Sequence, residues 1–227
     1  MTAARRSALF ALLLVAPVPT LAVSAGMVWW PGTPLGQTLF ALGKMWILAV
    51  PLIWHLLVDR LPPSWSPPWR GGLALGALSG VAIATGIVGV FLLCAPHIDA
   101  TAFRAPIHAA GVTTLPIFIA VALYTSFLNA LLEEYVWRWF VAGRAARLLP
   151  RAAAITVAAL AFAAHHLVAM AQYLPLPLAL LATLGVAIGG AWWSWLYLRY
   201  ESVWPGYLSH VIVDLAIFAI GGWLLFR

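Results

Sequence analysis

The stretch TTLPIFIAVALYTSFLNALLEEYVWRWFVA, residues 113–142, is long and apolar enough to cross a bilayer, yet it contains three charged residues. A transmembrane helix needs about 20 mostly apolar residues to cross about 30 Å of hydrocarbon. The charged residues are Glu133, Glu134 and Arg138. Each charge at the bilayer centre costs about 2.5 to 3.5 kcal/mol, so their burial needs a structural or functional reason. The stretch predicts a membrane helix that carries polar chemistry.

Six further apolar runs accompany this one along the chain. They are residues 7–29, 36–58, 71–95, 152–173, 175–198 and 203–226. Hydrophobic residues make up 64% of the sequence and charged residues only 8%, which lies far outside the range of soluble proteins. The runs are unbroken, whereas a transmembrane barrel needs shorter segments of alternating polarity. We predict an all-α, polytopic transmembrane bundle of about seven spans, forming a single membrane domain over residues 1–227.

The arginines are distributed unevenly between the two sides of this predicted bundle. With a cytoplasmic N-terminus, only Arg104 and Arg227 lie outside. The arginines on the inner side are Arg5, Arg6, Arg60, Arg70, Arg144, Arg147, Arg151 and Arg199. Basic loops stay in the cytoplasm, so this asymmetry predicts a cytoplasmic N-terminus. It also explains the formal net charge of +6 without a nucleic-acid partner.

The first run has the features of either a signal peptide or a retained helix. Two arginines precede it, and Val-Ser-Ala at residues 23–25 fits a cleavage site. Because the run is long and interrupted by prolines, we expect a retained helix. The longest connection, residues 96–112, is expected to be a loop on the outer surface. The excess of arginine over lysine, the many alanines and the short loops indicate a multi-pass protein of a bacterial inner membrane.

Two other predicted spans bring histidine into the membrane. His166 follows Phe162 by one helical turn, and His210 precedes Asp214 by one turn, so the members of each pair share a helix face. At 1.5 Å per residue from the cytoplasmic ends, Glu133 lies about 15 Å deep, His166 about 21 Å and His210 about 10 Å. These depths are close enough for one site.

The two adjacent glutamates have different local partners. Glu134 and Arg138 are separated by one turn, so they can pair and offset much of each other's desolvation. Glu133 points about 100° away from that pair and has no obvious local partner. Asn129, one turn earlier, extends a polar stripe along the same face. A carboxylate beside imidazoles suits proton abstraction from water. This pattern indicates a site that could hydrolyse a bond.

The same residues form three ordered motifs: Glu133-Glu134-x-x-x-Arg138, Phe162-x-x-x-His166 and His210-x-x-x-Asp214. In order and approximate spacing they resemble the motifs of the CAAX protease and bacteriocin-processing (CPBP, or Abi) family of intramembrane proteases. The run WLYLR at 195–199 and the residues leading to the third motif are similar as well. The resemblance covers approximately residues 113–220, which would form the protease core.

The resemblance implies a role for each motif residue. Glu133 would activate water with the help of His166, while His210 and Asp214 would flank the scissile carbonyl and stabilise the oxyanion. Glu134 and Arg138 would hold the helix geometry. The last motif position is often asparagine, and an ionised aspartate cannot donate a hydrogen bond. Asp214 is therefore either protonated or orients His210, and we favour the second role.

Zinc is an alternative for this site, because Glu133, His166 and His210 would make a two-histidine, one-carboxylate ligand set. The HExxH spacing of soluble zinc proteases is absent, and we expect metal-independent water activation with no cofactor. His165, beside His166, is the less favoured candidate for the working histidine.

We predict an intramembrane endopeptidase that cleaves a membrane-anchored or lipid-adjacent substrate, such as a C-terminal anchor or a small peptide. The expected partners are this substrate and the lipid bilayer. A proton-coupled transporter with a Glu and His relay is one alternative. A non-catalytic immunity or binding protein of the membrane is the other.

Overall fold

The computed structural model describes residues 2–63 and 66–227, and this part of the chain contains helices and their connections but no strand. The predicted all-α class is confirmed. The α-helices are α1 (Ala3–Val15), α2 (Val18–Ser24), α3 (Pro34–Ile53), α4 (Leu73–Cys94), α5 (Ala100–Ala109), α6 (Leu115–Leu123), α7 (Ala130–Glu133), α8 (Gly143–Ala145), α9 (Arg151–Met170), α10 (Leu176–Tyr200) and α11 (Trp204–Phe226). The π-helical segments are η1 (Ala25–Trp29), η2 (Trp54–Val58), η5 (Tyr124–Asn129) and η6 (Glu134–Ala142), and the 3₁₀ segments are η3 (Pro68–Arg70) and η4 (Ala95–His97).

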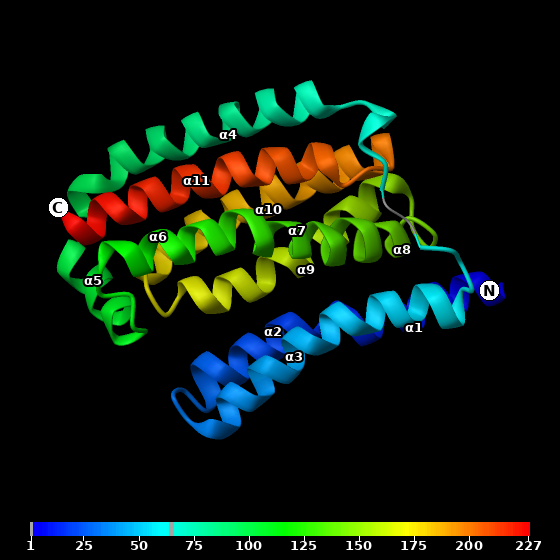
Figure 1. Ribbon diagram of the computed structural model, residues 1–227, viewed down its shortest axis with the longest axis horizontal. Coiled ribbons are helices and arrows are strands. Elements are labelled where there is room, and N and C mark those ends of the chain that lie inside the picture. Colours follow the sequence, from blue (N-terminus) through cyan, green and yellow to red (C-terminus); the bar gives the residue numbers. More distant parts are fainter. Residues whose placement is uncertain (1, 64–65) are drawn as a thin grey trace.

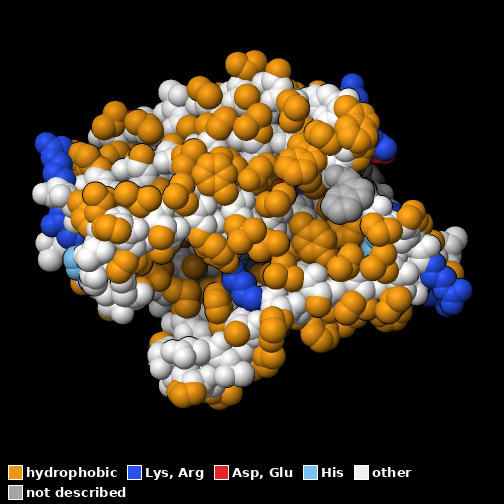
Figure 2. All heavy atoms as spheres, in the orientation of Figure 1, with side chains coloured by type: hydrophobic (Ala, Val, Ile, Leu, Met, Phe, Trp, Pro, Cys, Tyr) orange, Lys and Arg blue, Asp and Glu red, His pale blue; other side chains and the backbone are white. Residues whose placement is uncertain are grey.

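Within the described residues, seven helical units are long and apolar enough to cross a membrane, as predicted. They are Ala3–Trp29, Pro34–Val58, Leu73–Cys94, Leu115–Ala145, Arg151–Met170, Leu176–Tyr200 and Trp204–Phe226. Their outer surfaces expose large apolar side chains, including Leu57 and Leu93. Figure 2 shows apolar side chains across the middle of one face, with most Lys and Arg side chains near the two ends of the molecule. This surface suits a lipid surrounding, and the cytoplasmic N-terminus stays a prediction.

Helices α4 and α11 run side by side along their length (Figure 1). Glycines allow this close approach. A Cβ on Gly76 would lie 2.3 Å from the carbonyl oxygen of Pro205, and one on Gly80 would lie 2.9 Å from the Cα of Ser209. Small residues let membrane helices pack backbone to backbone. This contact fixes the half of α11 that carries His210.

Helices α2 and α3 form a hairpin along one side of the bundle, and its turn points away from α9 in Figure 1. The hairpin is tight, because a Cβ on Gly43 would lie 2.4 Å from the Cβ of Ala22. Tyr135 donates a hydrogen bond of 2.9 Å to the carbonyl of Leu48 and so ties α3 to the fourth span. Figure 2 shows a hollow between this hairpin and the helices above it, with a basic side chain at its wall.

The predicted outer loop, residues 96–112, contains the short helix α5, which was not predicted from the sequence. The Asp99 side chain caps this helix by accepting hydrogen bonds from two backbone N–H groups of its first turn, at 2.8 and 3.2 Å. Arg104 Nε donates to the carbonyl of Leu224 at 2.8 Å. The helix is thereby tied to the end of α11.

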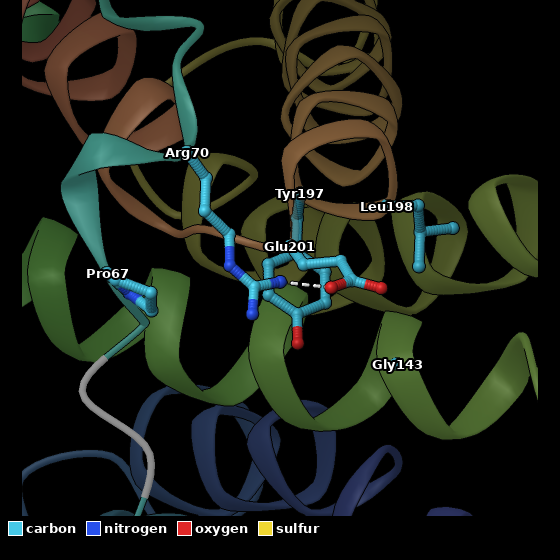
Figure 3. Close-up of a pocket in the computed structure, with 6 residues that line it drawn as sticks. All are labelled: Pro67, Arg70, Gly143, Tyr197, Leu198 and Glu201. Atoms are coloured by element: carbon cyan, nitrogen blue, oxygen red, sulfur yellow. Dashed lines mark hydrogen bonds and ion pairs between the residues drawn. The ribbon is translucent and has the colours of Figure 1, made fainter.

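At the opposite end of the molecule, ion pairs connect the loops. Asp59 pairs with Arg144, whose side chain is buried, and lies 3.7 Å from a guanidinium nitrogen of Arg147. Nearby, Arg70 and Glu201 point toward one another and pair at the edge of a pocket of about 350 Å³ (Figure 3). The pocket is lined by Pro67, Arg70, Gly143, Tyr197, Leu198 and Glu201. None of these residues belongs to the predicted site.

Replacing Asp59 with asparagine removes the carboxylate that pairs with buried Arg144. We expect the free energy of unfolding to fall by about 3 to 5 kcal/mol, because a buried guanidinium would lose its counter-charge. SDS titration in mixed micelles measures the free energy of unfolding. Arg70→Gln is the control, because its exposed ion pair contributes less than about 1 kcal/mol. Equal losses of unfolding free energy in Asp59→Asn and Arg70→Gln would contradict the conclusion that the buried pair of Asp59 and Arg144 stabilises the fold.

Candidate active site

The ionisable side chains predicted for the site come together between three spans. They are Glu133, Glu134 and Arg138 of the fourth span, His166 of α9, and His210 and Asp214 of α11. The fourth span changes from α to π geometry after Glu133. Such π segments are frequent at functional sites.

Glu134 and His210 form the innermost contact. His210 Nδ1 lies 3.1 Å from Glu134 Oε1, and both side chains are buried. A carboxylate only accepts hydrogen bonds, so Nδ1 carries the proton and the ring orientation is fixed. The third motif is therefore attached to the first through the glutamate that was predicted as structural support.

The other ring nitrogen of His210 faces two carboxylates. Nε2 lies 3.7 Å from Glu133 Oε2 and 3.7 Å from Asp214 Oδ1. Both distances exceed normal hydrogen-bond length. Nε2 is thus placed between the two acids without a direct bond to either.

Aromatic rings hold His210 in this position. The Trp193 ring stacks on it with centroids 4.0 Å apart and planes at 16°. Trp193 Nε1 donates at 3.0 Å to the hydroxyl of Ser209, the residue before His210. Phe162, from the second motif, meets the imidazole edge to face at 6.3 Å. The imidazole has little freedom to tilt.

Arg138 is fully buried beside Glu134, with Nε 3.3 Å from Glu134 Oε1. Its guanidinium lies over the rings of Phe162 and Trp193, at 4.3 and 5.0 Å from their centroids. Cation–π contacts of this kind help to offset desolvation. The predicted ion pair is confirmed, and it also places Phe162.

Glu133 is held by an amide. Asn129 Nδ2 donates to Glu133 Oε1 at 2.9 Å, and Asn129 Oδ1 accepts from Lys44 Nζ at 3.3 Å. The polar stripe expected from the spacing of Asn129 and Glu133 is present. Lys44 is an addition that the motifs do not predict. Its signal in the sequence was a single cation in the middle of the predicted span 36–58.

Both histidines of α9 reach Glu133. His166 Nδ1 lies 2.9 Å from the carbonyl oxygen of Phe162, so this nitrogen carries the proton in the neutral ring and Nε2 has a free lone pair. The rings of His165 and His166 lie 4.2 Å apart, and His165 stacks on Trp137. The structure therefore does not separate the favoured histidine from its neighbour.

Three of these side chains could hold a metal ion. One ligand atom each from Glu133, His165 and His166 lie within 4.8 Å of one another. Two imidazoles and a carboxylate fit the donors that zinc prefers. The predicted zinc set used His210 in place of His165. Glu134 holds only Nδ1 of His210 and leaves Nε2 open, but among the described residues the ligand atoms that group most closely are those of Glu133, His165 and His166.

Comparison with known proteins agrees with the motifs. The family model described as type II CAAX prenyl endopeptidase Rce1-like matches residues 115–216, a range that contains all three motifs. The match confirms the family resemblance predicted from them. No curated protein and no solved structure matches the chain.

Gly206 at the start of α11 leaves room for Glu134, because a Cβ there would lie 2.5 Å from Glu134 Oε2. We expect Gly206→Ala to lower the free energy of unfolding by about 1 to 3 kcal/mol, since the carboxylate must move away from His210. Gly185→Ala on α10 is the matched control, because no atom lies within 4 Å of its added Cβ. SDS unfolding measures both. A Gly206→Ala protein as stable as the control would contradict this packing.

Proposed function

Because residues 115–216 match the Rce1-like type II CAAX prenyl endopeptidases, we propose that the chain is an intramembrane endopeptidase in which Glu133 activates water. Its substrate is a membrane-anchored or lipid-adjacent peptide, such as a C-terminal anchor. The observation that carries the proposal is the position of Glu133. One carboxylate oxygen lies 3.7 Å from His210 Nε2, and the side chain is grouped with His165 and His166.

Glu133 suits the role of general base. Asn129 holds its Oε1, while Oε2 faces His210 across a distance that leaves the carboxylate without a direct hydrogen bond to the ring. A water molecule in this space would be within reach of the base and would be oriented by His166. A positioned general base contributes roughly 10² to 10⁴-fold to such a reaction.

His210 is suited to stabilise the oxyanion. Glu134 holds Nδ1, so Nε2 is the nitrogen that can face a substrate carbonyl. A doubly protonated ring donates from both nitrogens, and the nearby carboxylates would stabilise its charge. Glu134 would then position the ring, a role that the sequence favoured for Asp214. Asp214 would act through the charge it places 3.7 Å from Nε2.

The proton balance is complete with these groups. Glu133 takes a proton from water, the hydroxide adds to the carbonyl carbon, and the oxyanion is stabilised by the N–H of His210. The C–N bond then breaks, and Glu133 returns its proton to the leaving amine. The products are a carboxylic acid and a free amine.

A zinc ion held by Glu133, His165 and His166 is the alternative to this scheme. When bound, it would polarise the carbonyl or the water as a Lewis acid. We propose the metal-independent scheme, because Glu133 needs no further ligand to act as a base.

Glu133→Gln tests the function. We expect cleavage of membrane-anchored reporter peptides by the purified protein to fall at least about 10³-fold, because the amide cannot take a proton from water. SDS unfolding checks that the Glu133→Gln protein is folded and as stable as the wild type.

Glu201→Gln is the matched control. Glu201 is an exposed carboxylate in the pocket of Figure 3, outside the site, and its neutralisation should leave cleavage unchanged. Equal cleavage by the wild type and Glu133→Gln would remove Glu133 from the mechanism. Failure of the wild type to cleave any reporter would count against the endopeptidase.

Metal content separates the two schemes. We expect the active protein to contain less than stoichiometric zinc by elemental analysis and to keep its activity in a chelator. His165→Gln should then retain cleavage within about tenfold of the wild type, since only the zinc scheme needs three protein ligands. Stoichiometric zinc whose removal abolishes cleavage would establish the alternative.

A further inference from the structure

Lys44 is the only lysine of the chain, and it lies deep in a membrane span. It lies ten positions after Pro34, the first residue of the second span, which ends at Val58. At 1.5 Å per residue, its Cα is about 15 Å from the nearer end. A cation at this depth is costly unless it has a partner.

The contacts of Lys44 leave its charge unpaired. Nζ lies 3.3 Å from Asn129 Oδ1, a neutral amide oxygen, and 5.7 Å from the centroid of the Phe40 ring. Over residues 2–63 and 66–227, no carboxylate oxygen lies within 4.0 Å of it. An ammonium has three donors, so it retains hydrogen-bonding capacity.

The side chain is exposed, and it is the only basic one of α3. One amide, that of Asn129, separates the ammonium from Glu133. That separation is about the length of two residues of an extended peptide, at roughly 3.3 Å each. An anion bound at Lys44 would therefore lie a short peptide length from the proposed base.

We propose that Lys44, oriented by Asn129, is a subsite that binds a carboxylate of the substrate. The proposal rests on the proposed function and names a chemical group that the substrate carries. Lipid phosphates stay at the bilayer surface, about 15 Å from this depth, so the peptide supplies the anion. The carboxylate is either the free C-terminus or an Asp or Glu side chain near the scissile bond. Binding it there sets which peptide bond faces Glu133.

Binding of peptides in nanodiscs tests the subsite without turnover, using Glu133→Gln as the parent protein. Three Leu/Ala-rich peptides carry a neutral fluorophore at the N-terminus. One has a free C-terminal carboxylate, one is amidated, and one is amidated but contains a single glutamate. We expect at least one carboxylate peptide to bind more tightly than the plain amide. Adding Lys44→Met should weaken that binding by about tenfold or more, because a buried anion loses its partner.

Two further variants separate charge from structure. Lys44→Arg keeps the cation and should retain the preference for a carboxylate. Gln37→Met, two turns earlier on the same helix, should change no affinity. The peptide that responds to Lys44→Met identifies the source of the carboxylate. Equal affinities for all three peptides, or an equal loss for the amide in Lys44→Met, would overturn the subsite. Because no cleavage is measured, a Lys44-dependent preference would stand even if the wild type proved inactive on every reporter.

Discussion

The structure depends on the burial of one carboxylate, that of Glu134, inside a hydrocarbon-embedded bundle. An ionised carboxylate there is stable only when it is paired and hydrogen-bonded. Arg138 and His210 supply the two partners, one from the same helix and one from α11. Residue 206 is a glycine because Glu134 occupies the space that a side chain there would fill. The rings of Phe162 and Trp193 cover the guanidinium of Arg138. One buried charge thus connects residues of four spans.

The two adjacent glutamates illustrate how environment divides roles. Glu134 is fully buried and holds His210, whereas the Glu133 side chain is 18% exposed and bonds to an amide. A carboxylate held between a guanidinium and an imidazole is suited to hold geometry, and a carboxylate that borders open space is suited to react. The motif places both on successive residues, so the helix directs one inward and the other toward the space beside His210 and α9.

The spans and most of the site could be predicted because both rest on local rules. Apolar length gives the spans, and one-turn spacing gives the pair Glu134–Arg138. Contacts between segments that are distant in the sequence could not be predicted. No periodicity indicates that His210 bonds to Glu134, or that Lys44 meets Asn129 across 85 residues. His165 was disfavoured because its Cβ points about 100° from that of His166, yet both rings lie close to Glu133. Helix α5 was missed because its signal is a single capping aspartate.

The π-helical segment Glu134–Ala142 follows directly after Glu133. A π segment contains an extra residue relative to α geometry, so its length determines the angular register of everything on either side of it. Loss of one residue here would return this segment to regular α-helix and turn Glu133 by about 100° relative to Gly143 and the residues beyond it. Glu133 would then lose its present angular relation to the part of the span after the segment, even if the deleted residue were outside the motif. The number of residues in this segment is therefore constrained by the angular position of Glu133. Substitutions, which keep that number, do not test this constraint.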